Sequence, residues 1–354
     1  MSRLELTKQL NLECAIKSKP TKKLKEILNK CDVERLRDYY NVITKKENED
    51  NKKSLIDKIY NELTDENIIH NFLSNLKENE YQQLVKIIEN NGEYQDNYIK
   101  IEDYGYLKYF GILYMFNYQD NLHIIIPDEI MDVIKNMDVN AYHQKTIENS
   151  KLVNLAYSML NLYGVVPLDI YLDACCKYYD YKNAQEINLD CLFIPERTIS
   201  VKAIRNENNV YIVKDDVFDE YDGYIIYKTI IGLEDDLYAF NFKEMSLEEL
   251  LKYQNLFYYE ENDEIIKFIE YLRNYNLNDE DIDLFIGSLI LSFRRNYNEG
   301  ILILNDISEE FGIELNEDNL EEIMSYINNI INNIPNWGNK GWTNKEIILG
   351  KCYE

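Results

Sequence analysis

Near the middle of the chain, apolar residues at helical spacing give way to the alternating pattern of a β-hairpin, and this order restricts the folds that the chain can adopt. Lys151–Tyr163 places its apolar residues on one helical face, and Gly164 supplies the left-handed residue that commonly ends a helix. Pro167 suits the first turn of a helix, so a second helix is predicted over Leu168–Tyr179. The pattern therefore predicts two consecutive helices joined by a short turn.

A third helix and a hairpin follow these two helices. The helix is shorter and is predicted over Asn183–Phe193. Side chains then alternate along Thr198–Arg205 and Val210–Lys214, on either side of the polar turn Asn206–Asn209. Gly223–Tyr227 could be an extra strand or a short helix, because periodicity does not separate these two. The predicted order is three helices and then one hairpin.

The same order is predicted once earlier in the chain. Thr64, followed by two acidic residues, is expected to cap the first of three helices, and the other two cover about Glu80–Glu89 and Tyr98–Phe110. A hairpin with a polar turn follows over Ile112–Ile126. Because this hairpin is apolar on both faces, we expect it to be buried.

Three helices followed by a hairpin resemble a winged helix, and the resemblance implies two winged-helix-like units. The two hairpins differ in polarity, since Lys202 and Arg205 interrupt only the later one, so one of its faces can meet solvent or a partner. Asn183 and Gln185 on the third helix could read base edges, but two polar residues on a helix are more often a solvated face. The apolar earlier hairpin favours winged helices that pack against protein over those that read DNA.

The net charge of the chain is −26, so the chain as a whole should repel DNA and RNA. The charge is distributed unevenly. Residues 1–65 hold 15 Lys and Arg against 12 Asp and Glu, whereas the remaining residues hold 23 against 52. Contact with nucleic acid is therefore expected in residues 1–65 or at a local basic spot.

Residues 21–61 predict two amphipathic helices joined by a charged loop, and Val33, Leu36 and Tyr40 recur at helical spacing between them. This stretch resembles the small helix-extended-helix modules called SAP or Rho N-terminal-like domains, and the resemblance implies binding to nucleic acid. In place of the usual short glycine-bearing turn, the chain has a charged segment after Val42. The alternative is a charged helical pair at the edge of the fold. The matching positions are Leu36, Val42, Lys52, Lys53, Leu55 and Ile56.

Past the second hairpin the chain is predicted to be helical. Ser246 and Glu249 have the spacing of a capping box, in which each residue bonds the other's backbone amide. Apolar residues predict further helices over Ile265–Leu272 and Asp281–Tyr297, and a long helix is expected to start near Asn316.

The C-terminal segment resembles the tail of a group of uncharacterised proteins of Firmicutes, some of which carry SEC-C metal motifs. Only Cys352 follows this tail, so the resemblance implies the architecture without zinc. The alternative is structural: both tryptophans of the chain fill the helical core, and Gly341 makes the turn between them. The matching positions are Asn333, Trp337, Gly341, Trp342, Thr343 and Glu346.

Motifs that would indicate an enzyme are missing from the sequence. It has no Gly-rich phosphate loop, Gly-x-Ser-x-Gly elbow or His-Glu-x-x-His helix. Its three histidines have no metal-site spacing, and a zinc site from Cys175, Cys176, Cys191 and His143 is unfavourable because adjacent cysteines do not easily chelate together. The six cysteines are expected to be free thiols. No catalytic residue, metal or cofactor is predicted.

The sequence thus predicts a mainly α protein that is cytoplasmic, because it shows no signal core or membrane span. Its composition also suggests an AT-rich bacterial or phage genome. Four parts are expected: a SAP-like helical module at 1–65, winged-helix-like units at 66–145 and 146–245, and a helical domain at 246–354.

The expected function is a non-enzymatic regulator or adaptor that acts near DNA or RNA. The alternative is an acidic protein that binds a basic protein partner, as a nucleic-acid mimic does, and an enzyme without a recognisable motif is third. Nucleic acid would be contacted through Lys22, Lys23, Lys52, Lys53, Lys202 and Arg205.

Overall fold

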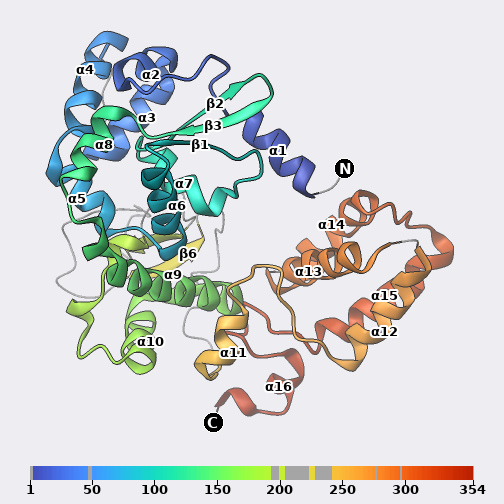
Figure 1. The fold of residues 1–354 in the computed structure, drawn as a ribbon. Helices are drawn as coiled ribbons and strands as arrows, with labels where there is room; N and C mark the ends of the chain where they lie inside the picture. Colours follow the sequence, from blue (N-terminus) through green and yellow to red (C-terminus); the bar gives the residue numbers. More distant parts are fainter. Residues whose placement is uncertain are drawn as a thin grey trace. The chain divides into compact units, whose positions relative to one another are not determined.

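The computed structural model describes residues 3–46, 50–192, 199–203, 223–227, 241–275, 277–295 and 297–353 (Figure 1). The chain forms two compact units, Met1–Lys151 and Leu152–Glu354, and the division falls within helix α9 (His143–Tyr163). The described part is mainly helical, as predicted, and its strands form two three-stranded sheets. The predicted parts 1–65 and 66–145 lie in the first unit, and 246–354 lies in the second.

The first unit begins with more helices than predicted between residues 21 and 61. The prediction of only two helices was wrong, because the residues at helical spacing between them form a helix of their own. Asp32 accepts a hydrogen bond from the Arg35 amide at 2.7 Å and so starts a new helix directly after the preceding one ends. The helices of this region are α2 (Leu24–Lys30), α3 (Val33–Thr44) and α4 (Lys52–Leu63), and α1 (Arg3–Glu13) precedes them.

The rest of the first unit follows the predicted order, with one additional strand. Asp65 rather than Thr64 caps the next helix, accepting hydrogen bonds from two backbone amides, while Thr64 ends α4. The short strand β1 (Glu93–Gln95) was not predicted. The other elements are α5 (Glu66–Ser74), α6 (Glu78–Glu89), α7 (Ile101–Tyr109), β2 (Tyr114–Tyr118), β3 (Asn121–Ile125), α8 (Asp128–Lys135) and the 3₁₀ turn η1 (Val139–Tyr142).

The predicted hairpin of the first unit is present and buried. β3 is the central strand of the antiparallel sheet β1-β3-β2, and Gln119 and Asp120 make its turn with φ angles of 55° and 59°. On the outer side of β2, Ile16 exchanges hydrogen bonds with the backbone of Met115 and Asn117. The apolar side chains of the hairpin are at most 2% exposed, which confirms the prediction of burial.

In the second unit, the first two predicted helices are confirmed and the third is not. α9 ends at Tyr163, and α10 (Leu168–Tyr179) has the predicted bounds. Instead of a helix over Asn183–Phe193, the structure has two 3₁₀ turns, Ala184–Glu186 and Leu189–Cys191. The Asn183 side chain bonds the Gln185 amide, and such local bonds favour turns over a continuous helix.

The sheet of the second unit pairs strands that the sequence did not pair. β6 (Gly223–Tyr227) lies between β4 (Val165–Pro167) and β5 (Ile199–Ala203), and both pairings are antiparallel. The described partner of β5 is therefore β6. The predicted turn and second strand of the hairpin, residues 206–214, lie outside the described residues.

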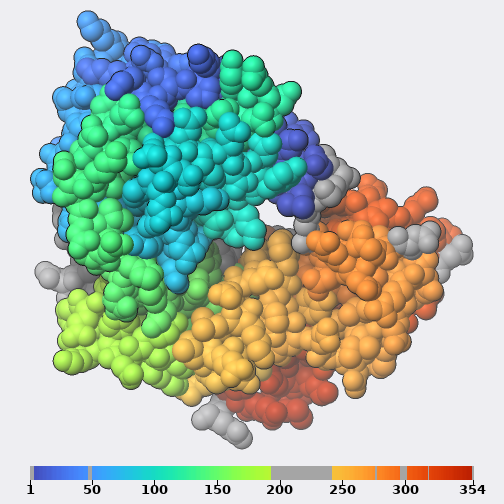
Figure 2. All heavy atoms as spheres, viewed as in Figure 1, coloured from blue at the N-terminus to red at the C-terminus, as the bar shows by residue number. Residues whose placement is uncertain are grey.

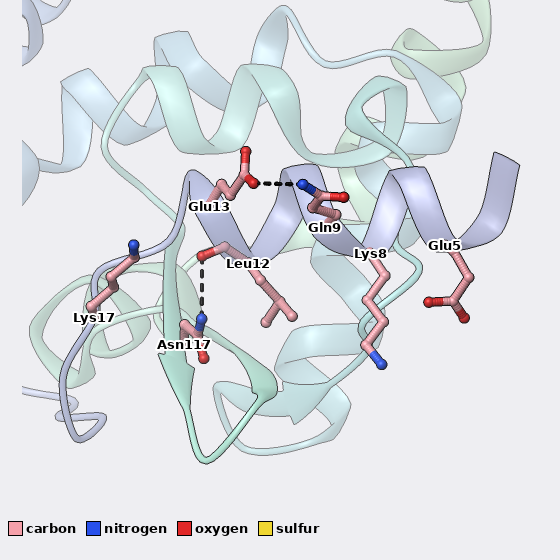
Figure 3. A pocket seen from close by; sticks show the side chains of 7 residues that line it. All are labelled: Glu5, Lys8, Gln9, Leu12, Glu13, Lys17 and Asn117. Atoms are coloured by element: carbon pink, nitrogen blue, oxygen red, sulfur yellow. Dashed lines mark hydrogen bonds between the residues drawn. The ribbon is translucent and has the colours of Figure 1, made fainter. Parts of the chain in front are cut away.

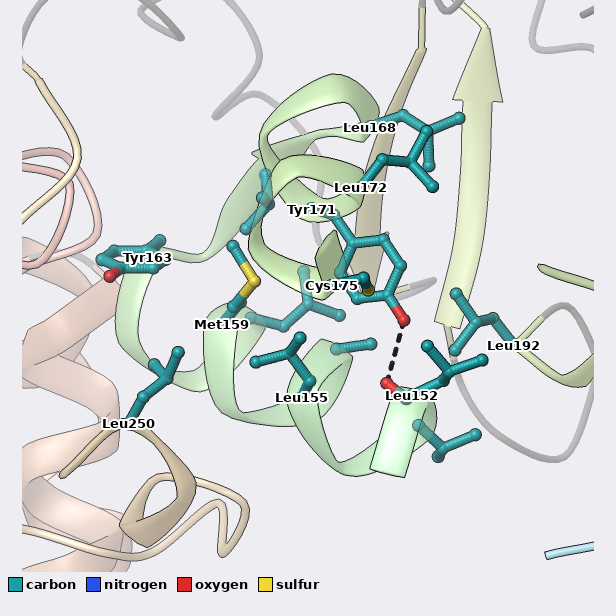
Figure 4. Packing of buried hydrophobic residues seen from close by; sticks show 14 of the residues in the cluster. Leu152, Leu155, Met159, Tyr163, Leu168, Tyr171, Leu172, Cys175, Leu192 and Leu250 are labelled. Atoms are coloured by element: carbon teal, nitrogen blue, oxygen red, sulfur yellow. Dashed lines mark hydrogen bonds between the residues drawn. The ribbon is translucent and has the colours of Figure 1, made fainter. Parts of the chain in front are cut away.

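The core of this part of the second unit is formed by α9 and α10 (Figure 4). Leu155, Met159 and Leu172 are among its buried side chains, and the Tyr171 hydroxyl donates to the Leu152 carbonyl at 3.0 Å. Residues 265–334 form a second, separate helical core. Its helices are α12 (Asp263–Leu272), α13 (Asp279–Arg295), α14 (Tyr297–Glu310) and α15 (Glu317–Ile331). α11 (Leu247–Lys252) precedes them and contributes Leu250 to the core of α9 and α10, and α16 (Asn344–Ile348) follows them. The predicted capping box of Ser246 and Glu249 starts α11.

Candidate functional site

The lysines predicted to contact nucleic acid are mostly engaged within the first unit. Lys22 donates to the Asn91 carbonyl at 3.0 Å and lies 3.5 Å from the Glu93 carboxylate. Lys23 forms an ion pair with Asp128 of α8 at 3.2 Å, and the hydrogen bond that Lys23 donates to the Asp128 carboxylate raises the pKa of Lys23. The surfaces of α2 and α8 adjoin in Figure 2. These two lysines thus link the N-terminal helices to the sheet and to α8.

The other predicted contacts are less constrained. The Lys52 ammonium group donates to the Asn29 carbonyl at 2.8 Å, and Lys53 is exposed on α4. Of Lys202 only the backbone, in strand β5, is described, and Arg205 lies outside the described residues. Other lysines of these helices are paired with carboxylates: Lys25 with Asp57, and Lys58 with Asp50.

A groove in the first unit brings together polar side chains that are distant in sequence. We call it the His70 groove. It has a volume of about 750 Å³ and lies between α5 on one side and η1 with the adjoining residues of α8 and α9 on the other. Its lining residues are Glu66, Asn67, His70, Ser74, Asn136, Met137, Asp138, Ala141, Tyr142 and Lys145.

A histidine and a tyrosine meet within this groove. His70 Nδ1 lies 2.5 Å from the Tyr142 hydroxyl, and the two rings meet edge to face. Burial, with a smaller contribution from the negative charge of Glu66, raises the pKa of Tyr142. The hydroxyl therefore stays protonated at neutral pH and can donate its proton to the imidazole. The hydrogen bond holds the tyrosine ring in place as part of the groove wall.

The charges of the His70 groove suit a cationic ligand. Glu66 and Asp138 contribute two carboxylates against the single ammonium group of Lys145, and the amides of Asn67 and Asn136 add donors and acceptors. A half-buried tyrosine ring also attracts cations. Among the described residues, no group of three or more His, Cys, Asp or Glu side chains could hold a metal ion. The sequence did not suggest this site, because His70 and Tyr142 are 72 positions apart and no motif includes them.

A smaller groove of about 260 Å³ lies between α1 and β2 (Figure 3). Glu5 and Glu13 carry charges opposite to those of Lys8 and Lys17, so its lining is electrically balanced. The Asn117 side chain crosses it and donates to the Leu12 carbonyl at 3.3 Å. This contact attaches α1 to the sheet, and we regard the groove as structural.

The positions of the C-terminal segment that resemble a known tail have structural roles here. Trp337 is 2% exposed, and its indole donates to the Asn161 carbonyl at 3.0 Å. Trp342 is half-buried and donates to the Asn241 carbonyl at 2.8 Å. Gly341 turns the chain between them with a φ of 84°. All six cysteines of the chain are free, as expected.

We predict that one ion pair of this tail makes stability depend on pH. The Glu346 carboxylate accepts two hydrogen bonds from Lys243, at 2.8 and 3.0 Å. Burial raises the pKa of Glu346, but Lys243 and Thr343 lower it more, so the pKa lies below its ordinary value of 4.5. A carboxyl group with a lowered pKa stabilises the folded state above that ordinary value, and the contribution is lost as the pH falls through the lowered pKa.

Thermal melts of the wild type and Glu346→Gln from pH 7 to pH 3 test this prediction. The wild type should have the higher Tm at pH 7, and the difference should shrink below about pH 4.5. Glu244→Gln is the control, because the Glu244 side chain is 86% exposed and lies 3.5 Å from Lys177. A difference between wild type and Glu346→Gln that is constant across this range would contradict the prediction.

Comparison with known proteins identified no relative of this chain. No protein-family model, no curated protein and no solved structure matches the chain. No helix among the described residues has both the length and the apolar character needed to cross a membrane.

Proposed function

We propose that this chain is a non-enzymatic adaptor that binds a basic segment of a protein partner in the His70 groove. The observation that carries the proposal is the composition of the groove. Its two carboxylates outnumber its one ammonium group, and the Tyr142 ring provides a face for a cation. A lysine or arginine side chain fits such a site, because its aliphatic part can lie along Met137 and Ala141 while its charged end meets Glu66 or Asp138.

The charge of the whole chain supports the same class of partner. With 64 Asp and Glu against 38 Lys and Arg, long-range attraction speeds encounter with basic proteins and slows encounter with nucleic acid. Lys22 and Lys23, which were expected to contact phosphates, have carboxylates beside them. To bind a phosphate, each lysine would first have to give up a carboxylate neighbour, which reduces the net gain.

Nucleic acid is the second candidate, and the start of α4 favours it. Lys53 is exposed there, and the ammonium group of Lys52 donates to the carbonyl group of Asn29. Both lysines lie in the first turn of the helix, where the helix dipole also favours an anion.

We predict that a fluorescent arginine-rich peptide binds the full chain at low salt. Glu66→Gln combined with Asp138→Asn should weaken binding about tenfold, equivalent to ~1.4 kcal/mol, because the peptide then loses both carboxylates of the groove. The matched control is Glu321→Gln with Glu322→Gln, which removes the same charge from exposed positions of α15. Fluorescence anisotropy measures all three proteins.

The outcomes separate the two candidates. If both double variants lose the same affinity for the peptide, binding depends on the net charge of the chain, and the assignment to the groove is overturned. Absence of peptide binding, together with binding to a DNA duplex or an RNA strand that weakens steeply with salt and is lost in Lys52→Ala with Lys53→Ala, would favour the second candidate.

A further inference from the structure

A fully buried arginine of the second unit has no hydrogen-bond partner for its guanidinium among the described groups. Arg294 lies on α13 and is 1% exposed. None of its three guanidinium nitrogens has a hydrogen-bond partner in the part of the chain that the structure describes. The backbone there is firmly held, since the Trp337 amide donates to the Arg294 carbonyl at 3.0 Å.

An isolated buried cation is strongly unfavourable. Moving a charge out of water costs far more than one hydrogen bond contributes, unless the charge is paired and bonded. A buried lysine can lose its proton, but a guanidinium group stays protonated in proteins. Arg294 therefore needs an acceptor, and none of the described groups provides one.

The neighbouring side chains that the structure describes enclose the guanidinium but accept no hydrogen bond from its N–H groups. The Tyr253 ring centroid lies 5.1 Å from Arg294 Cζ, so the ring covers a face of the guanidinium without occupying its N–H groups. Glu260 is the nearby carboxylate, but it is exposed and accepts a hydrogen bond from the Tyr253 hydroxyl at 3.0 Å. Tyr253 thus engages Glu260 without bringing it into hydrogen-bond contact with Arg294.

We propose that Arg294 is the receptor of a small oxyanion bound inside the second unit, with inorganic phosphate or sulfate as the chemical class. The planar fork of N–H donors matches two oxygens of such an anion and forms short, charge-assisted bonds with them. Tyr253 holds the guanidinium plane, and Trp337 holds the backbone of α13 at this position. This site is independent of the His70 groove, which lies in the first unit.

The test is a thermal melt of the full chain with increasing inorganic phosphate at constant ionic strength. The wild-type Tm should rise by several degrees and then saturate, because a ligand that binds only the folded state stabilises it. Arg294→Met should show no such rise. The matched control is Arg273→Met, which removes an exposed arginine of the same unit and should keep the full rise. Sulfate should act like phosphate.

Two further variants keep the outcome decisive. Without phosphate, Arg294→Met should melt no lower than the wild type, because an apolar side chain replaces an unpaired buried charge. If this variant does not fold, Arg294→Lys serves instead, and its phosphate-dependent rise should be much smaller because the fork is lost. Glu260→Gln should keep the rise in Tm. A wild-type Tm that does not respond to phosphate, an equal rise in Arg294→Met, or loss of the rise in Glu260→Gln would overturn the proposal.

Discussion

Ile125→Asp is expected to abolish cooperative folding of the first unit. Ile125 lies in the central strand of its sheet, opposite Glu93 of β1 and Tyr114 of β2, and is fully buried. The substitution loses about 1.5–3 kcal/mol of apolar burial and places an unpaired carboxylate among apolar side chains. The second cost is several kcal/mol, and the total is comparable to the roughly 5–15 kcal/mol by which a protein is stable.

The matched control for this variant is Asn121→Asp. Asn121 lies in the same strand but is exposed beside the turn, so its new charge remains in water. Circular dichroism melts and gel filtration compare both variants with the wild type. Asn121→Asp should melt near the wild type, whereas Ile125→Asp should aggregate or show no cooperative transition for the first unit. A normal melt of Ile125→Asp would mean that the hairpin is not packed as described.

Gly164→Ala has the second largest expected effect, because two costs meet at one position. Gly164 has a φ of 78°, which an L-residue adopts at a cost of about 1–2 kcal/mol. A Cβ atom there would also lie 2.7 Å from Cγ of the buried Trp337. Relieving that clash requires the indole to move away from Asn161, and overpacking of this kind costs about 1–3 kcal/mol more.

Gly312→Ala separates the two costs. Gly312 also has a positive φ, 70°, but a Cβ atom there would meet nothing within 4 Å. Its substitution should therefore cost about 1–2 kcal/mol from backbone strain alone. Urea denaturation of both variants measures the difference in free energy of unfolding. If Gly164→Ala costs no more than Gly312→Ala, the contact with Trp337 does not constrain the helix end as described.

The C-terminal tail connects distant parts of the second unit through backbone groups. Trp337 and Trp342 each donate their indole proton to a carbonyl far away in sequence, at Asn161 and Asn241. The Tyr163 hydroxyl donates to the Lys243 carbonyl at 2.6 Å. Through these contacts both tryptophans hold the C-terminal segment against residues 161 and 241.

The sequence alone predicted those features whose causes are local. Helices appear as a 3.6-residue periodicity of apolar side chains, so α9, α10 and α12 could be located without coordinates. Ser246 with Glu249 starts a helix because the two residues bond each other's amides over three positions. Burial of the first hairpin followed from its apolar residues on both faces, since no solvated face was left.

Predictions failed where short-range alternatives compete. Residues 183–193 have the apolar content of a helix, but the Asn183 side chain bonds a nearby backbone amide and turns result. The helix between residues 33 and 44 was not separated from its neighbours, because only the cap at Asp32 marks where it begins.

Tertiary structure alone decided which distant groups meet, because pairing across the chain leaves no periodic pattern in the sequence. Lys22 and Lys23 are indistinguishable from nucleic-acid-binding lysines until the fold places Glu93 and Asp128 beside them. His70 and Tyr142 become one groove only when α5 packs beside η1. In the sequence, Arg294 is an ordinary basic residue near the end of a helix. Packing around Tyr253 and Trp337 removes Arg294 from water, and a buried charge is unfavourable unless a partner of opposite charge binds it.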